Sequence, residues 1–384
     1  MKIGAGRVVP PFRVMDVARA ANERAATLPS GAPKILRMEV GQPGTGLPHG
    51  AKLAVQAALQ SGDALGYTEA LGNPSLRARI ARHMEDWYGV DIPAARIAVT
   101  LGASGAFSLA FLASFDQGDK VALAAPYYPP YVNTLTALGM QPVVMPCGIE
   151  TGFQPTIGML DALPEKPAGL IIASPANPTG SMLAPAELEA LCRYCDENGI
   201  RLISDEIYHG LTYGKPQASA AQFSASAVVV NSFSKYFSMT GWRVGWMALP
   251  EDMVRVTERL AQNMFICPPH IAQIAAEAAF ACREELEANR ATYQAARSIL
   301  TTGLREAGYS TFAPPDGAFY VYADVSSRTE DSALFCEQLL ASHSIAATPG
   351  LDFDAARGGR YVRFSYCAPL ADIEDAVARL KQPG

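Results

Sequence analysis

Short runs of β-branched and apolar residues alternate with longer helical patterns through the middle of this 384-residue chain. The expected strands span residues 96–100, 120–124, 142–146, 169–173, 201–205, 228–232 and 244–249. The expected helices between them span residues 103–115, 129–138, 185–198 and 252–263. This alternation is typical of a mostly parallel α/β sheet. Ligands of such sheets bind beyond the carboxyl ends of the strands, so the loops that follow these strands are the first place to look for a site.

The pattern changes toward the C-terminus. A helical pattern with few breaks covers residues 271–307, which is long enough to bridge two lobes, and a smaller α+β lobe follows, with strands at 319–324 and 361–365 and helices at 331–343 and 371–381. The first 45 residues hold a proline-rich arm, a helix at 16–27 and a strand at 35–40 that could complete this lobe. Because the chain is long enough for two domains, we predict a large domain of residues 46–285 and a small domain of residues 1–45 and 286–384. Asn73 as N-cap and Pro74 as first residue predict one further helix start.

Composition narrows the class of protein. The net charge is −6 without a sustained basic run, which argues against a nucleic-acid surface. Seven scattered cysteines favour a reducing compartment over a disulfide framework. The first residues lack the apolar core of a signal peptide, and the longest apolar stretches are too short to cross a bilayer. We therefore expect a cytoplasmic protein.

A single lysine follows the strand expected at 228–232. Residues 231–235 read Asn-Ser-Phe-Ser-Lys, and residues 239–243 read Met-Thr-Gly-Trp-Arg, which places Arg243 eight residues after Lys235. A nearby cation or loss of water lowers the pKa of a lysine amine enough for it to act as a nucleophile. The plainer alternative is a solvated loop lysine beside an ordinary surface arginine.

Three further loops carry polar groups at equivalent positions. Residues 203–208 deliver Asp205 from an apolar strand, followed by Tyr208, although a capping aspartate and a half-buried tyrosine would look the same. Residues 174–180, Ser-Pro-Ala-Asn-Pro-Thr-Gly, form either a rigid turn or a site loop whose Asn177 donates to an anion. Residues 100–106 are small and open a helix, where free amides and the helix dipole can hold a phosphate.

These four elements, in this order and spacing, resemble the class I/II aminotransferases, which are pyridoxal-phosphate (PLP) enzymes of fold type I. The resemblance covers nearly the whole chain and implies a three-layer αβα fold with a mostly parallel sheet and a smaller α+β domain. It also implies that Lys235 forms a Schiff base with PLP and moves the substrate proton. Asp205 would pair with the pyridine nitrogen, and Tyr208 and Asn177 would donate to the ring oxygen. The other positions that match cofactor contacts are Ala103, Ser104, Ser232 and Arg243 around the phosphate and Tyr128 stacked on the ring.

The resemblance also assigns residues to the substrate and to a partner subunit. Arg363 matches the arginine that grips the α-carboxylate, and Gly41 matches a glycine that leaves room beside the substrate. Tyr67 matches a tyrosine that reaches the phosphate of the neighbouring subunit, which implies a homodimer with shared active sites. The implied reaction is ping-pong transfer of an amino group from an L-amino acid to a 2-oxo acid, either 2-oxoglutarate or pyruvate. A C–S β-lyase, or another enzyme of this fold that does not transaminate, is the alternative.

The chain departs from aspartate-specific relatives at residues 263–268. In those relatives an arginine of the partner subunit in this region reads a second carboxylate, and this segment has none. The difference favours an apolar or aromatic substrate side chain, or another route to 2-oxoglutarate, for which Arg13 in the N-terminal arm could substitute. The Cys192–Cys195 spacing resembles half of a zinc site, but it lies in a helical pattern without a second pair, so we expect helix packing and no metal.

Overall fold

The computed structural model describes residues 1–382 and is built around a seven-stranded sheet. The strand order is β2-β8-β7-β6-β5-β3-β4, and β8 runs antiparallel to both of its neighbours while the other pairs are parallel. The strands are β2 (Ile97–Thr100), β3 (Lys120–Ala125), β4 (Gln141–Pro146), β5 (Gly169–Ala173), β6 (Arg201–Asp205), β7 (Val228–Ser232) and β8 (Gly245–Ala248). Each overlaps a predicted strand, and the mostly parallel α/β class is confirmed.

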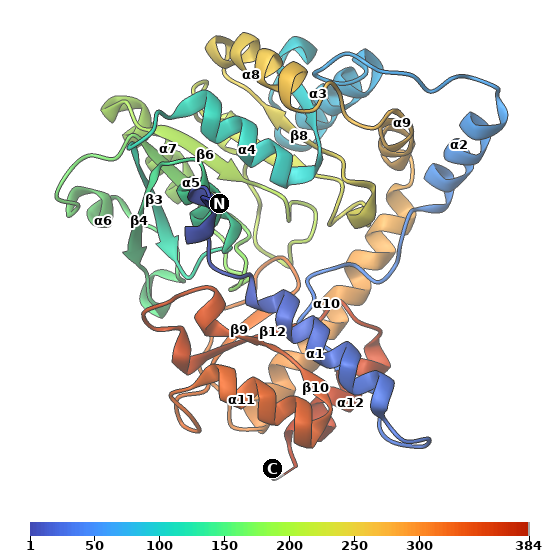
Figure 1. Ribbon diagram of the computed structural model, residues 1–384, viewed down its shortest axis with the longest axis vertical. Coiled ribbons are helices and arrows are strands. Elements are labelled where there is room, and N and C mark those ends of the chain that lie inside the picture. Colours follow the sequence, from blue (N-terminus) through green and yellow to red (C-terminus); the bar gives the residue numbers. More distant parts are fainter. Residues whose placement is uncertain (383–384) are drawn as a thin grey trace.

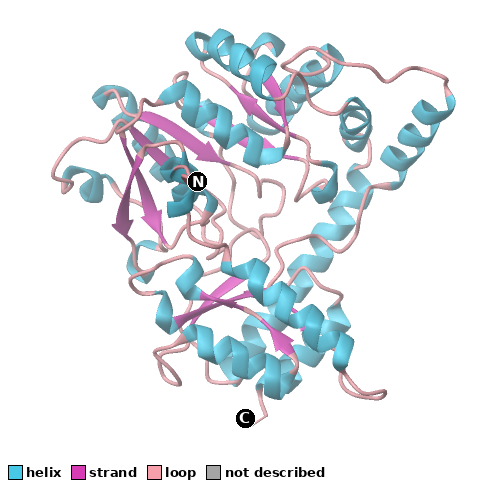
Figure 2. Ribbon diagram, viewed as in Figure 1, coloured by secondary structure: helices cyan, strands magenta, loops and turns pink. Residues whose placement is uncertain are grey.

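Both faces of this sheet are buried under helices (Figures 1 and 2). Successive residues of β5 pack on opposite faces of the sheet. Leu170 and Ile172 belong to one hydrophobic cluster, and Ile171 between them belongs to another. The first cluster contains side chains of α3 (Pro74–Tyr88) and α7 (Pro185–Asn198), and the second contains side chains of α4 (Gly102–Ser114), α5 (Pro130–Ala137) and α8 (Glu251–Met264). Because side chains of a strand alternate between faces, this arrangement is the predicted three-layer αβα structure. The remaining helices of this part are α2 (His49–Gln60), α6 (Ile157–Asp161) and α9 (His270–Ala279).

The C-terminal residues and α1 (Arg13–Thr27) lie together in the lower part of Figure 1, while residues 5–8 lie beside α5 in the upper part. Three antiparallel strands occur in the order β11-β12-β9, with bounds Thr348–Pro349, Tyr361–Ser365 and Tyr320–Asp324. The arm joins them through β1 (Leu36–Arg37), which pairs in parallel with β10 (Ile345–Ala346). The helices here are α1 (Arg13–Thr27), α11 (Ser332–Gln338) and α12 (Leu370–Leu380), and α10 (Arg283–Glu306) leads into this part from the large sheet's side.

Four local predictions differ from the structure. The helical pattern at 271–307 is interrupted between α9 and α10, where Phe280 turns into an aromatic cluster with Phe233 and Phe237. Pro74 does begin α3, but the Asn73 side chain makes no capping bond. The strand expected at 35–40 is reduced to the two residues of β1. The helix expected at 331–343 is α-helical only in α11, and a π-helical turn, Leu339–His343, continues it to the expected end. Among the described residues no helix is long and apolar enough to span a bilayer.

Candidate active site

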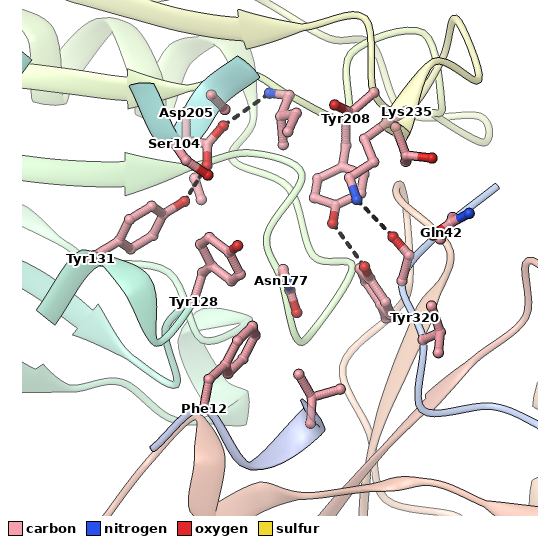
Figure 3. Close-up of a pocket in the computed structure, with 18 of the residues that line it drawn as sticks. Phe12, Gln42, Ser104, Tyr128, Tyr131, Asn177, Asp205, Tyr208, Lys235 and Tyr320 are labelled. Carbon is pink, nitrogen blue, oxygen red and sulfur yellow. Dashed lines mark hydrogen bonds between the residues drawn. The ribbon is translucent and has the colours of Figure 1, made fainter. Parts of the chain in front are cut away.

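A cavity of about 680 Å³ opens where the carboxyl ends of β5, β6 and β7 face α1, β9 and β12 (Figure 3). Ten of the twelve predicted site residues line it, which brings together segments more than 300 residues apart in the sequence. They are Gly41, Ala103, Ser104, Tyr128, Asn177, Asp205, Tyr208, Lys235, Arg243 and Arg363. The two that do not line it are Ser232 and Tyr67.

Lys235 reaches the cavity from the turn that follows β7. Its Nζ donates a hydrogen bond to the carbonyl oxygen of Gly41, 2.6 Å away. The pKa of Lys235 is lowered to about 8, chiefly by loss of water around the side chain and also by the positive charges of Arg363 and Arg243, while Cys367 and Asp205 oppose the shift. An amine with this pKa is unprotonated in about one molecule in ten at pH 7, far more than an ordinary lysine, and the unprotonated form is the one that attacks a carbonyl carbon.

Asp205 ends β6 and is buried. Its carboxylate accepts hydrogen bonds from the hydroxyl of Tyr131 and from the backbone N–H of Ile207, the latter at 3.0 Å. Burial raises the pKa of Asp205 to about 6, and the two hydrogen bonds oppose that rise. A buried carboxylate held in this way can pair with a cationic ring nitrogen. Sequence reasoning missed Tyr131, whose only signal was its place three residues after Tyr128.

Arg363 lies buried on β12 with no carboxylate partner among residues 1–382. Its Nη1 donates to Oδ1 of Asn177 at 2.9 Å, and its Nη2 donates to the carbonyl of Glu39 and the hydroxyl of Thr348. Its Nε has no hydrogen-bond partner in the described structure. The hydrogen-bond partners of Arg363 are all neutral, and the nearby carboxylates of Glu39 and Asp352 interact with it only through space, so its free Nε and planar guanidinium are suited to a ligand carboxylate.

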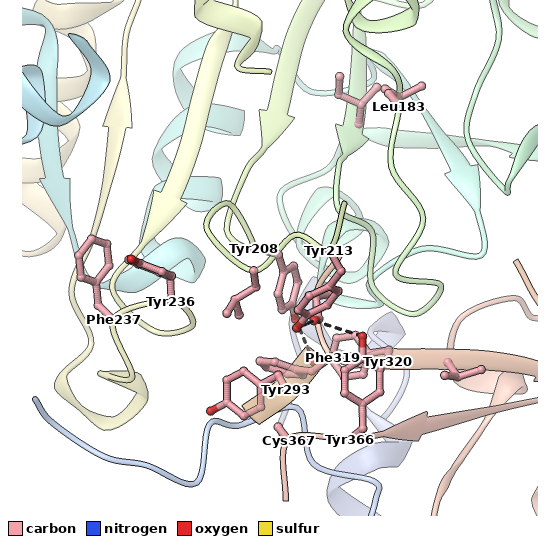
Figure 4. Close-up of a cluster of buried hydrophobic side chains, with 14 of the residues drawn as sticks. Leu183, Tyr208, Tyr213, Tyr236, Phe237, Tyr293, Phe319, Tyr320, Tyr366 and Cys367 are labelled. Carbon is pink, nitrogen blue, oxygen red and sulfur yellow. Dashed lines mark hydrogen bonds between the residues drawn. The ribbon is translucent and has the colours of Figure 1, made fainter. Parts of the chain in front are cut away.

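Tyr320 connects the two ends of the cavity and was also missed by the sequence analysis. Its hydroxyl lies 2.8 Å from the hydroxyl of Tyr208, and its ring centroid lies 4.5 Å from Cζ of Arg363. The two tyrosine rings pack edge to face at 5.7 Å, in the aromatic cluster that Figure 4 shows between the two parts of the molecule. A Cβ atom on Gly41 would approach the Tyr320 hydroxyl to 1.8 Å, so only glycine fits at position 41 without rearrangement.

The opposite end of the cavity is suited to a phosphate. Helix α4 begins there without a side-chain cap, so its first-turn amides at Ala103 and Ser104 are free for an anion. Arg243 faces the same turn, because a Cβ on Gly102 would lie 2.6 Å from its Nη2. Ser232 is fully buried behind the cavity wall, and its hydroxyl lies 2.8 Å from that of Ser234, which does line the cavity. These donors, with Lys235 and Asp205, fit a phosphorylated aldehyde with a basic ring nitrogen.

The wall beside Arg363 is apolar. Phe12, Val14, Met15 and Ala18 contribute from α1 and the residue before it, and Val40 contributes from the arm. Arg13 is exposed and does not line the cavity, and neither does any residue of the segment 263–268. Within the described part of the chain, the cationic side chains that line the cavity are therefore Lys235, Arg243 and Arg363.

The Cys192–Cys195 pair packs inside a helix, as the sequence predicts. Cys192 and Cys195 are both buried on α7, and loss of water raises the pKa of both thiols, that of Cys195 to about 12. Over residues 1–382 no cluster of three histidine, cysteine or acidic side chains could hold a metal ion.

On this αβα sheet the cavity therefore combines a lysine whose pKa is lowered, a buried acid, an uncapped helix start and a buried arginine. The chain belongs to the aminotransferase class I and II family, whose model matches residues 33–380. It is 50% identical to the valine–pyruvate aminotransferase of Mycobacterium tuberculosis, over 97% of this chain and 96% of that protein. This protein is therefore an aminotransferase, and the β-lyase alternative is not favoured.

Solved structures agree with this assignment. An aminotransferase from Mycobacterium tuberculosis superposes with a TM-score of 0.96 at 48% identity, covering 99% of this chain and 98% of that one. The aspartate aminotransferase of Thermus thermophilus with maleate superposes with a TM-score of 0.92 at 30% identity, covering 99% of each chain. Both the fold class and the predicted family are confirmed.

Proposed function

We propose that this aminotransferase uses PLP and exchanges amino groups between an amino acid with an apolar side chain, such as valine, and pyruvate. One observation carries the substrate part of the proposal. Of the three cations in the cavity, Lys235 and Arg243 face the cofactor end, and Arg363 remains for a single carboxylate. The wall beside Arg363 is apolar, which matches an aliphatic side chain and leaves a second carboxylate unpaired. The relative named valine–pyruvate aminotransferase supports the same choice.

The cavity residues would hold PLP as follows. Lys235 would bind it covalently, Asp205 would keep its ring nitrogen protonated, and Tyr128 would stack on the ring. Asn177 uses its Oδ1 to accept from Arg363, so its Nδ2 is left to donate to the ring oxygen, and Tyr208 donates to the same atom. The N-terminus of α4, Ser104 and Arg243 hold the phosphate, and Ser232 supports them through Ser234. When bound, PLP supplies an electron sink for cleavage of the Cα–H bond.

The protein's own groups orient the substrate and move its proton. Arg363 fixes the α-carboxylate through a planar pair of hydrogen bonds, which turns the Cα–H bond perpendicular to the ring. The amine of Lys235, when it is free, would take the proton from Cα.

Two further features belong to this proposal. Tyr67 is 83% exposed and does not line its own cavity, so we assign it to the phosphate of a partner subunit in a homodimer. We also assign residues 46–285 to a large domain and residues 1–45 with 286–384 to a small one, in a cytoplasmic enzyme.

A panel of single amino acids tests the substrate assignment. The loaded protein is mixed with one donor at a time, and conversion of the cofactor is followed by absorbance while the released oxo acid is identified by mass spectrometry. We expect aliphatic donors to react at least ~10-fold faster than aspartate or glutamate, with pyruvate restoring the starting spectrum. Aspartate or glutamate as the fastest donor would contradict the apolar assignment. Release of pyruvate with ammonia would instead support a β-lyase.

A further inference from the structure

A histidine lies buried behind the cavity wall, one residue after Tyr208. His209 is 3% exposed and belongs to the turn that follows β6. Its Nε2 lies 2.9 Å from the carbonyl oxygen of Ser174, and its Nδ1 lies 2.7 Å from the hydroxyl of Tyr88 on α3. Neither the expected cofactor contacts nor the expected substrate contacts make use of this side chain.

The hydrogen bonds of His209 fix its tautomer. A carbonyl oxygen can only accept, so Nε2 carries the proton and donates to Ser174. Nδ1 is then the acceptor, and the Tyr88 hydroxyl donates to it. Loss of water lowers the pKa of His209 to about 4, so the ring is neutral at working pH. The remaining ionisable neighbour is Glu206, whose Oε2 lies 3.5 Å from Nδ1 and whose Oε1 accepts from Ser204 and the Ala220 N–H.

His209 connects the loops of the two residues assigned to the ring oxygen. It is bonded in sequence to Tyr208, and its hydrogen bond holds Ser174, which begins the loop that carries Asn177. The Ser174 hydroxyl also accepts from the N–H of Leu183, and the Ser174 N–H donates to the carbonyl of Asp205, so this end of the loop is held at three atoms, one of them by His209. Without the imidazole, a buried carbonyl would lose its donor and the loop would shift to find another.

We propose that His209 is a positioning residue that sets the separation of Tyr208 and Asn177, with Tyr88 fixing its tautomer. The inference rests on the proposed function, because it takes these two side chains as donors to the ring oxygen of PLP. Donors to an oxygen stabilise its anionic form, so well-placed donors lower the pKa of the bound cofactor. Misplaced donors raise it.

The chain offers both a graded series and a matched control. His209→Ala removes both hydrogen bonds, His209→Gln can restore the one to Ser174, and Tyr88→Phe removes only the tautomer-fixing donor. His83 is also a buried histidine, but it packs among the rings of Trp87, Tyr88 and Phe280 and makes no hydrogen bond among the described residues. His83→Ala therefore controls for loss of a buried imidazole beside Tyr88 while both hydrogen bonds of His209 are kept.

Two measurements test the inference. In the loaded protein, the pH midpoint of the cofactor absorbance should rise by about one unit in His209→Ala, a tenfold change in proton affinity, and by less in His209→Gln and Tyr88→Phe. In the protein without cofactor, hydrogen exchange of residues 174–183 should be ~10-fold faster in His209→Ala. His83→Ala should leave both unchanged.

Outcomes separate this inference from the function on which it rests. A wild-type protein that binds no PLP refutes the proposed function, and the exchange measurement then still decides whether His209 holds the loop. An unshifted midpoint with unchanged exchange in His209→Ala overturns the positioning role. If that variant does not fold, Tyr88→Phe decides, because it retains the packing, and wild-type values in both measurements would again overturn the role.

Discussion

Two ionisable groups in the cavity depart from their ordinary pKa values in opposite directions. Burial lowers the pKa of Lys235 to about 8 and raises that of Asp205 to about 6. Both shifts have the same cause, since burial disfavours whichever form is charged. At neutral pH the amine is therefore available as a nucleophile in part of the molecules, while the acid is still mostly ionised and can hold a cation.

The lysine shift predicts how the protein without cofactor reacts with an aldehyde. Trapping by borohydride at Lys235 should rise with pH with a midpoint near 8, because only the neutral amine attacks, while exposed lysines should respond near their usual pKa of about 10.4. Peptide mass spectrometry across a pH series measures both. Lys235→Ala should abolish trapping at this position, and Lys120→Ala at the surface should not. A midpoint above 10 at Lys235 would contradict the assigned environment.

Tyr131 should be required for Asp205 to stay ionised and pair with a ring nitrogen. Its hydroxyl stabilises ionised Asp205, so Tyr131→Phe should raise the pKa of Asp205 and slow the half-reaction by about 10- to 100-fold, as expected for one hydrogen bond to a charge. Single-turnover absorbance measures the rate. Tyr194→Phe removes a similar bond to Asp161 on the surface and should leave the rate unchanged. Equal half-reaction rates in Tyr131→Phe and Tyr194→Phe would contradict a role for Tyr131 in the active site.

At the scale of elements, α1 places its apolar residues in the cavity only because a distant residue caps it. Asp352, buried in the turn after β11, accepts from the backbone N–H groups of Arg13 and Val14 at 3.0 and 3.2 Å. Phe12, the N-cap itself, offers no side-chain acceptor. The helix start is therefore held from the other end of the chain.

Removing this cap should loosen the substrate wall. Asp352→Ala should lower the free energy of unfolding by about 1 kcal/mol and raise KM for the amino donor several-fold, since α1 would no longer be fixed over the cavity. Asp331→Ala removes the equivalent cap from α11, outside the cavity, and should destabilise the fold similarly without changing KM. Urea unfolding and steady-state kinetics measure the two effects. An unchanged KM in Asp352→Ala would show that α1 does not shape the substrate site.

At the scale of the whole molecule, exposed apolar side chains gather beside the loop that carries Tyr67. Met264 and Ile266 are 43% and 51% exposed, and the backbone N–H of Thr68 donates to Sγ of Cys267 at 3.4 Å, so the two segments are in contact. Apolar groups exposed in neighbouring segments mark an association surface. This surface is where we place the proposed subunit contact.

Ile266→Asp should therefore weaken the proposed dimer by about 100-fold, because it places an unpaired charge in an apolar contact. Sedimentation equilibrium gives the dissociation constant, and PLP retention should fall with it if Tyr67 binds the partner's phosphate. Leu334→Asp, at a position on α11 that is 49% exposed, should change neither quantity. A wild-type protein that stays monomeric at micromolar concentration would refute the shared active site.

The sequence by itself determined the sheet, the helices around it and the residues at the carboxyl ends of the strands. These features depend on periodicity and on short motifs, which are local, and each predicted strand of the large sheet is observed within two residues at either end. Lys235 and Arg243 likewise lie in the single segment that connects β7 and β8, so the family resemblance could identify their spacing.

Only the tertiary structure decided the contacts between distant segments. Distant contacts of this kind are Tyr131 at Asp205, Tyr320 between Tyr208 and Arg363, and Asp352 at the start of α1, and they join residues 43 to 339 positions apart. Such pairs leave no periodic signal, because each partner alone resembles an ordinary buried tyrosine or loop aspartate. The shifted pKa values follow from the same packing, since burial is a property of the assembled fold and of no single motif.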